Sequence, residues 1–264
     1  MDRKRPRGIK IHLYSPPSAI SSSGSPRPVL VNWHGSGFVI PLHDSDAPFC
    51  AQVAKEAGIY VLDADYSKAP EAPFPAALDD VRDVLNWVAT QPERFDASRV
   101  AVSGFSAGAA LALIASSTLR SSLKVNIKIV IAIYPITDLT LGGGDRVIPK
   151  PVRPLSPWAL QLFCDCYAPD ASMRKDARVS PTYAKAEDFP DTVVLITCEG
   201  DVLEPEAKAL AERLDDGRRK VTKSLLKGMH HGFDKGDPRK GTEVWERRVE
   251  AYRLAVDALR GSLG

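Results

Sequence analysis

The chain has 264 residues, of which 44% are hydrophobic and 26% are charged, with a formal net charge of +2. This length suffices for one α/β domain with a large core. The near-neutral charge gives no electrostatic case for a nucleic-acid or membrane partner. No apolar run approaches the roughly 18 residues of a membrane span, and no signal-peptide core follows Met1. We therefore expect a cytoplasmic protein without a nucleic-acid partner or membrane span.

The four cysteines are sparse, and in a chain without an export signal they are predicted to be free thiols. They are Cys50, Cys164, Cys166 and Cys198. Cys164 and Cys166 lack the companion ligands that would indicate a metal site. We therefore predict no metal site.

Apolar runs alternate with amphipathic segments along most of the chain. Strands are predicted at 9–14, 29–33, 59–63, 99–103, 127–134, 192–198 and 221–226, and helices at 45–57, 76–90, 205–214 and 242–259. The first of these helices is predicted to be capped by Ser45 and closed by Gly58. This alternation predicts a single α/β domain over residues 9–264, built on a mostly parallel sheet with helices on both faces. A basic tail at 1–8 is expected to be disordered, and a Pro/Ser-rich loop at 16–28 to be mobile.

One segment, at about 139–184, interrupts this alternation with four prolines followed by an amphipathic stretch at 158–167. It is too long for an ordinary loop in a compact domain. We predict a helical cap over the carboxyl ends of the strands, where open parallel sheets bind ligands. For each of its aromatic residues, lining a pocket and pinning the insert to the core are equally plausible roles.

The central feature of the sequence is Gly104-Phe105-Ser106-Ala107-Gly108, which lies between a β-branched strand and an Ala/Leu-rich helix. A G-x-S-x-G strand-to-helix turn exposes a strained serine above the strand ends, and its glycines remove side chains that would collide there. The start of the helix aims free backbone N–H groups, Ala107 nearest, at charge that develops beside the serine. Ser106 is therefore a candidate nucleophile.

A serine nucleophile needs a base, and the base needs an orienting acid, in loops that follow later strands. His230 and His231 follow the last predicted strand and cannot both face one hydroxyl. We assign His231, which precedes flexible Gly232, as the base and give His230 a structural role. Asp201, in a turn after a strand, is the predicted acid, with Glu199 as the second choice.

Backbone N–H donors for an oxyanion hole must converge from a second loop. Gly35-Ser36-Gly37 follows an early strand and carries little side-chain bulk. This loop is the candidate for the second set of donors, although an ordinary glycine turn would read the same way.

Several separated stretches, in chain order, resemble the hormone-sensitive-lipase-like branch of the α/β-hydrolases. His34 to Phe38 resembles its His-Gly-Gly-Gly signature, and Asp65 to Pro75 resembles its Tyr-Arg-Leu-Ala-Pro-Glu…Phe-Pro stretch. Its nucleophile elbow, Asp-Pro-Leu acid loop and histidine loop resemble Gly104 to Gly108, Glu199 to Leu203 and His231 to Phe233.

The resemblance implies carboxylic-ester hydrolysis without a cofactor. It gives Ser106 as nucleophile, Asp201 as acid and His231 as base. It also gives the oxyanion N–H groups to Ser36, Gly37 and Ala107, and makes the 139–184 insert part of the cap.

Departures from the family pattern bear mainly on the substrate site. Ser36 replaces the middle glycine of the signature, Phe105 stands where the family often has Asp or Glu, and Ser67-Lys68 replaces Arg-Leu. The helices that usually precede the first strand and complete the cap are not in this sequence, which predicts either a more open, promiscuous site or a truncated chain. Candidate substrate-binding residues are Phe38, Phe105, Trp158 and Phe163.

The leading hypothesis is a serine esterase that acts on short- or medium-chain acyl esters, or on lactones, through an acyl-enzyme. Because the base must be unprotonated, activity is expected to fall as the pH drops through roughly 6–7. The alternatives are a non-catalytic small-molecule binder on the same fold and an acyltransferase that uses the same triad. A homodimer is one possible assembly.

Overall fold

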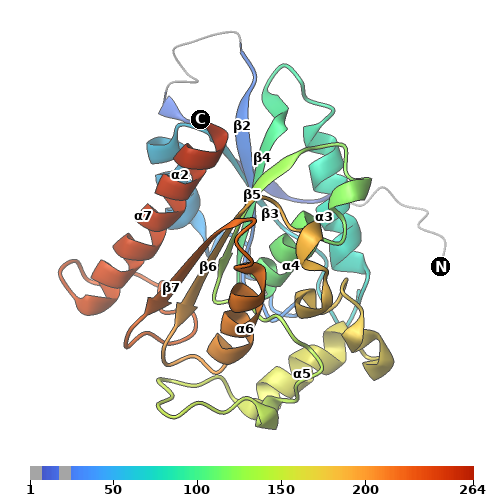
Figure 1. Ribbon diagram of the computed structural model, residues 1–264, viewed down its shortest axis with the longest axis vertical. Coiled ribbons are helices and arrows are strands. Elements are labelled where there is room, and N and C mark those ends of the chain that lie inside the picture. Colours follow the sequence, from blue (N-terminus) through green and yellow to red (C-terminus); the bar gives the residue numbers. More distant parts are fainter. Residues whose placement is uncertain (1–7, 18–24) are drawn as a thin grey trace.

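The computed structural model describes residues 8–17 and 25–264. Within these, a seven-stranded sheet has the order β1-β3-β2-β4-β5-β6-β7. Only β1 is antiparallel to its neighbour (Figure 1). The strands are β1 (Ile11–Tyr14), β2 (Arg27–Trp33), β3 (Tyr60–Ala64), β4 (Phe95–Phe105), β5 (Ile127–Ile133), β6 (Thr192–Cys198) and β7 (Lys220–Leu226). The predicted α/β-hydrolase architecture, a mostly parallel sheet in one domain, is confirmed.

Helices cover both faces of the sheet, which is why the inner strands are apolar along nearly their whole length. One face is covered by α2 and α7, and the other by α3, α4 and α6 (Figure 1). The helices are α2 (Ala47–Ala57), α3 (Ala76–Val88), α4 (Ala107–Ser116), α5 (Pro157–Tyr167), α6 (Glu204–Leu214) and α7 (Glu243–Leu263). Among the described residues, none of the helices is both long and apolar enough to cross a bilayer.

Most predicted elements are present with ends shifted by a residue or two. The strand before the elbow is longer than predicted and begins at Phe95. Helix α2 ends at Gly58, which has a φ of 70° as expected of a C-cap glycine. Its N-cap is Asp46 and not the predicted Ser45, and the Asp46 carboxylate accepts hydrogen bonds from Asn32 and Lys235 instead of from the helix N–H groups.

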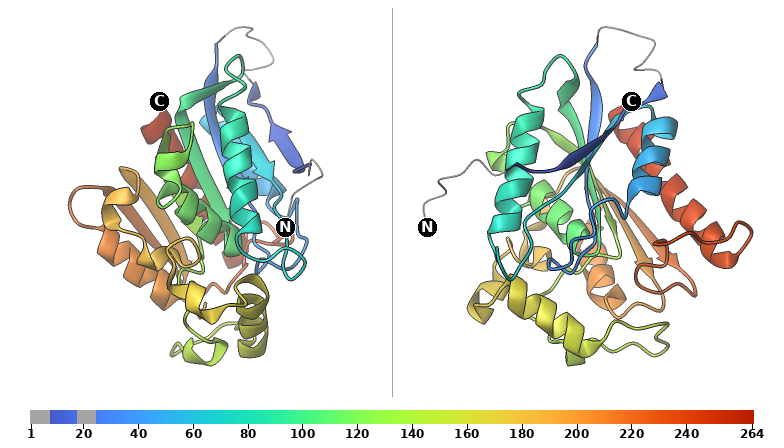
Figure 2. Two further views of the ribbon diagram at one scale, coloured as in Figure 1. Left: turned by 90° about the vertical axis from the view of Figure 1, so that its right-hand side faces the viewer. Right: turned by 180° about the vertical axis from the view of Figure 1, so that it is seen from behind.

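The segment at 139–184 lies at the carboxyl end of the sheet, with α5 beyond the ends of the strands (Figures 1 and 2). Around α5 it contains short 3₁₀ turns. The inward face of α5 buries Leu160, Cys164 and Tyr167, and the Tyr167 ring stacks on Phe38 with centroids 3.8 Å apart. Residues 1–7 of the predicted tail, and residues 18–24 of the predicted mobile loop, lie outside the described residues.

Candidate active site

The structure brings together the three side chains that were predicted to form a triad. Ser106 lies between β4 and α4, Asp201 follows β6 and His231 follows β7. His231 Nε2 is 2.8 Å from Ser106 Oγ, and His231 Nδ1 is 2.7 Å from Asp201 Oδ2. A carboxylate can only accept a hydrogen bond, so Nδ1–H donates to Asp201 and the lone pair of Nε2 faces the serine hydroxyl.

The strained turn at Ser106 is held by backbone packing. Ser106 has φ 52° and ψ −118°, outside the usual regions for a residue with a side chain. A methyl group on Gly108 would lie 2.0 Å from the Trp33 carbonyl oxygen, and one on Gly104 would lie 2.3 Å from the Gly108 carbonyl carbon. Both glycines of the motif are therefore required by close backbone approach.

Asp201 and Glu199, in the loop after β6, have different hydrogen-bond partners. Asp201 is buried, and its second carboxylate oxygen accepts the Leu203 N–H at 3.1 Å. Glu199 instead accepts the backbone N–H of Gly228 at 3.0 Å, which ties the acid loop to the start of the histidine loop. Of the two carboxylates considered from the sequence, Asp201 is the one in contact with His231.

His230 turns away from the triad. Its Nδ1 donates to the carbonyl oxygen of His231 at 2.8 Å. This contact shapes the histidine loop and agrees with the structural role that was predicted for His230.

A buried polar network beneath the histidine loop was not foreseen from the sequence. Asp234 accepts hydrogen bonds from the hydroxyls of Tyr134 and Tyr252, and from Lys235. Burial on its own would raise the pKa of Asp234, but Lys235 and the two hydroxyls hold that pKa below its usual range. Because the Tyr134 ring also packs edge-on against His231, at 4.8 Å between centroids, this network helps to fix the imidazole.

The loop after β2 packs directly against the elbow. A methyl group on Gly35 would lie 3.3 Å from Ser106 Cβ. Gly37 has φ 56°, and a methyl group there would lie 2.4 Å from the Phe163 ring. The Tyr66 hydroxyl donates to the His34 carbonyl oxygen, so Ser36 Oγ, 2.6 Å from it, is the donor to Tyr66. The Ser36 hydroxyl, which the glycine of the family signature lacks, thus attaches the loop to Tyr66.

A cavity of about 370 Å³ opens onto Ser106 and His231. Its apolar lining comes from the loop after β2, the segment after β5, the cap and the start of α6: Phe38, Ile40, Leu42, Ile136, Leu155, Leu160, Phe163 and Leu203. Two of the four predicted substrate-binding residues, Phe38 and Phe163, therefore face the cavity.

The other two residues, Phe105 and Trp158, do not line it, which corrects the prediction. Phe105 is fully buried on the α2/α7 face of the sheet, where its ring meets Phe49 edge-on and lies beneath Lys235 Nζ at 3.5 Å. Trp158 is 73% exposed, because it projects from the first turn of α5 on the side opposite its buried face.

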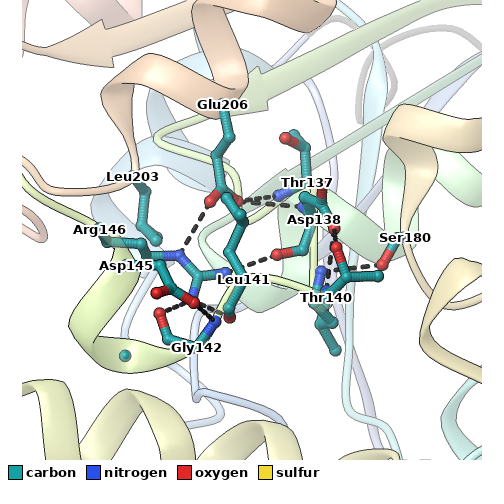
Figure 3. Close-up of polar contacts among 12 residues, drawn as sticks. Thr137, Asp138, Thr140, Leu141, Gly142, Asp145, Arg146, Ser180, Leu203 and Glu206 are labelled. Atoms are coloured by element: carbon teal, nitrogen blue, oxygen red, sulfur yellow. Dashed lines mark hydrogen bonds and ion pairs between the residues drawn. The ribbon is translucent and has the colours of Figure 1, made fainter. Parts of the chain in front are cut away.

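A buried ion pair attaches the cap segment to the start of α6, close to Asp201. Arg146 Nε donates to Glu206 at 2.9 Å, and the same guanidinium donates to the carbonyl oxygens of Asp138 and Leu141 (Figure 3). The other carboxylate oxygen of Glu206 accepts the N–H groups of Thr137 and Asp138. Burial raises the pKa of Glu206 despite these partners. The first part of the cap segment is thus fixed by charge and not by apolar packing alone.

A sheet of this topology, with a serine at the elbow after β4 and an acid and a histidine after β6 and β7, defines the α/β-hydrolase class. A model of the α/β hydrolase fold family matches residues 30–235. The chain belongs to this family.

Known proteins agree with this membership. The chain is 28% identical over 261 residues to an ethyl acetate hydrolase of Pseudomonas putida, covering 97% of this chain and 79% of that protein. A solved esterase of Pyrobaculum calidifontis superposes with a TM-score of 0.80 at 26% identity, over 97% of this chain and 82% of that one. Hormone-sensitive lipase of Mus musculus is 30% identical over 143 residues, 52% of this chain and 18% of the mouse protein. The resemblance to the hormone-sensitive-lipase-like branch is confirmed.

Proposed function

We propose that this protein is a serine carboxylic-ester hydrolase. The observation that carries the proposal is the continuous hydrogen-bonded chain from Ser106 Oγ through His231 to Asp201 at the mouth of an apolar cavity. Relatives that match most of the chain are named as ester hydrolases, such as the ethyl acetate hydrolase of P. putida. The proposal therefore combines a geometry suited to acyl transfer with the activity of similar proteins.

In this proposal Ser106 Oγ attacks the ester carbonyl carbon while His231 Nε2 takes its proton. The tetrahedral intermediate then collapses, the bond to the alcohol oxygen breaks and His231 returns the proton to the leaving alcohol. His231 Nε2 then takes a proton from water, which attacks the acyl carbon; the bond to Ser106 Oγ breaks, His231 returns the proton to Oγ and the acid is released. Asp201 keeps Nδ1 protonated throughout and stabilises the imidazolium that forms in each step.

The negative oxygen of each intermediate is assigned to the backbone N–H groups of Ser36, Gly37 and Ala107. Three observations support this assignment. Ala107 begins α4, Gly35 lies close to Ser106 Cβ, and Gly37, which has a positive φ, lies close to the Phe163 ring. Free N–H groups at a helix start favour negative charge. Loss of one such donor typically costs about 10²–10³ in rate.

The cavity favours acyl esters with short or medium chains, and the 139–184 segment is proposed to act as its cap. The lining offers apolar side chains around the triad, and Leu155, Leu160, Phe163 and Cys164 of the cap contribute to it. A panel of p-nitrophenyl esters from acetate to decanoate, with several lactones, measures the preference. We expect kcat/KM to peak at or below medium chain length because a cavity of about 370 Å³ limits the acyl group.

A labelling experiment tests the reaction class. A fluorophosphonate is expected to modify the wild-type chain at Ser106 and to leave Ser106→Ala unmodified, with esterase activity lost about 10⁴-fold or more in that variant. A wild-type chain that binds esters but neither turns them over nor accepts the label would support the non-catalytic binder instead. Product analysis with an added alcohol separates hydrolysis from acyl transfer, because only a transferase would form mainly the new ester.

Two further expectations accompany the proposal. A cytoplasmic location is supported by the four cysteines, which are all unpaired thiols, and cell fractionation tests it. A homodimer remains a prediction that size-exclusion chromatography with light scattering would measure.

A further inference from the structure

Four metal-ligating side chains meet at the edge of the sheet, outside the catalytic residues. His12 on β1 and Asp63 on β3 are direct partners in the antiparallel pairing, so their side chains lie on the same face. His43 and Asp44 come from the segment between β2 and α2. One potential ligand atom from each of the four residues lies within 4.8 Å of all the others.

The side chains of this cluster approach one another closely. His12 Nδ1 meets the Asp44 carboxylate, and the rings of His12 and His43 lie 4.5 Å apart. His43 Nε2 lies 3.1 Å from the backbone carbonyl oxygen of Asp63 but 4.0 Å from its carboxylate Oδ2. The last distance is too long for a hydrogen bond, so Nε2 is paired with the carbonyl oxygen and not with the carboxylate of Asp63.

Two buried atoms of the cluster have no hydrogen-bond partner. Asp63 is fully buried, and its Oδ2, which faces the His43 ring, is unpartnered. The His43 side chain is only 8% exposed, and its Nδ1 is also unpartnered. Because Nε2–H donates to the Asp63 carbonyl oxygen, neutral His43 carries its free lone pair on Nδ1. Buried polar atoms are nearly always satisfied in native proteins, so a free carboxylate oxygen and a free imidazole lone pair in one cluster call for an electron-pair acceptor.

Charge points the same way. Asn32 Nδ2 is shared between the carboxylates of Asp63 and Asp46, at 3.0 Å and 2.9 Å. Lys235 pairs with Asp46, but within the described residues Asp63 makes no salt bridge with a lysine or arginine. A cation bound beside Asp63 would supply the missing positive charge.

We propose that His12, His43, Asp44 and Asp63 form a binding site for a divalent transition-metal ion, with zinc as the best fit. Two imidazole nitrogens and two carboxylate oxygens are a donor set that suits zinc. Ligands about 2.0–2.2 Å from a tetrahedral zinc ion are roughly 3.3–3.6 Å apart. The four ligand atoms lie within 4.8 Å of one another, so side-chain shifts of roughly 1–1.5 Å at most would bring them to this spacing.

The bound ion would affect the cavity by holding one of its walls in place. The segment that carries His43 and Asp44 also supplies Ile40, Leu42 and Ser45 to the catalytic cavity. Linking this segment to β1 and β3 would fix one wall of the cavity and secure the edge strand. The inference does not depend on the proposed esterase activity.

Zinc binding is measured on the full chain, free of any affinity tag and stripped with a chelator. Isothermal titration with zinc chloride is expected to show one ion per chain. A saturating excess of about 100-fold over the dissociation constant is expected to raise Tm by about 5–10 °C. Cobalt substitution provides a spectroscopic readout, because bound cobalt should give visible absorption bands that free cobalt lacks.

Variants locate the ion. His12→Gln and Asp44→Asn alter partly exposed side chains and should fold, and each is expected to lose the zinc-dependent Tm shift and the cobalt spectrum. The control is His231→Gln, which removes the imidazole from another His–Asp pair, His231–Asp201. This variant should retain both signals. No stoichiometric binding by the wild type, or binding that is lost in His231→Gln and kept in His12→Gln, would overturn the proposal.

Discussion

The elbow at Ser106 and the 139–184 segment, proposed as the cap, both contribute to the same cavity but are fixed by different means. The elbow is fixed by backbone against backbone: Gly108 touches β2, Gly104 touches Gly108, and the Ser106 N–H donates to the Ile133 carbonyl oxygen. The first part of the cap segment is fixed by side-chain charge, through Arg146 and Glu206 (Figure 3).

This difference determines how each region tolerates change. A backbone contact leaves no room for any side chain, so the elbow depends on glycine itself. A buried ion pair depends on both partners being present, and removing the two charges together can be far less harmful than removing one. Substitutions can therefore distinguish a region held by backbone contact from one held by a buried ion pair.

The largest effect is expected at Gly108. In Gly108→Ala the new methyl group would lie 2.0 Å from the Trp33 carbonyl oxygen, so the elbow must move away from β2 or the chain must unfold. We expect loss of soluble protein or, in whatever folds, a fall in kcat of at least about 10²-fold, because misplacement by 1 Å has that cost. Expression yield, thermal unfolding and p-nitrophenyl acetate turnover measure it.

Gly261→Ala is the matched control for that substitution. Gly261 lies in α7, and a methyl group there would contact nothing within 4 Å. The variant is expected to keep full activity and to gain up to about 1 kcal/mol, because alanine favours helix. Equal tolerance of alanine at both positions would show that the elbow is not held by close backbone contact.

The next effect is expected at the cap. Arg146→Met leaves the Glu206 carboxylate buried without its partner and should cost about 3–5 kcal/mol. In Arg146→Met/Glu206→Gln the charge is gone, while the amide oxygen can still accept the N–H groups of Thr137 and Asp138. Denaturant titration should show that the double variant recovers most of the loss. A double variant as unstable as the single one would mean that Arg146 acts by packing and not by charge.

A pH-dependent effect is expected at Asp234, beneath the histidine loop. Asp234→Asn should cost about 2–3 kcal/mol at pH 7, because charged hydrogen bonds are lost in a buried site. The pKa of Asp234 is lowered on folding, so its ionised form contributes stability above about pH 4, and this contribution is lost as the pH falls through the lowered pKa.

Denaturant unfolding of wild type and Asp234→Asn across pH 3–8 tests whether folding lowers the pKa of Asp234. The difference in stability should be constant near neutrality and should narrow only below about pH 4. A difference that widened on acidification would contradict a lowered pKa for Asp234.

Local patterns indicated that Ser106, Asp201 and His231 would lie close together, because each lies in the connection after a strand and parallel strands bring their carboxyl ends to one edge. Ser106, Asp201 and His231 could therefore be placed without knowing any distant contact. The same holds for Gly58, whose helix-ending role depends only on its own backbone.

Features set by contacts between distant residues were missed. Phe105 is the last residue of β4, whose second half is buried on both faces, so the sequence gives no sign of which face its ring occupies. The Asp46–Lys235 pair spans 189 positions, so no local pattern around Asp46 indicates its partner. Likewise, His12, His43 and Asp63 carry no motif spacing, and the metal analysis of the sequence considered only cysteines.

The smallest effect distinguishes the two faces of α5. Phe163→Ala removes a ring that both lines the cavity and covers Gly37, so KM for medium-chain esters should rise about 3–10-fold, which corresponds to the loss of a partial apolar contact. Trp158→Ala removes a larger ring that is 73% exposed. It should leave KM unchanged and alter the free energy of unfolding by no more than about 0.5 kcal/mol. Ester kinetics on both variants compare them directly. A larger effect at Trp158 than at Phe163 would show that substrate enters over the outer face of α5, and would restore the role that the sequence first suggested for this tryptophan.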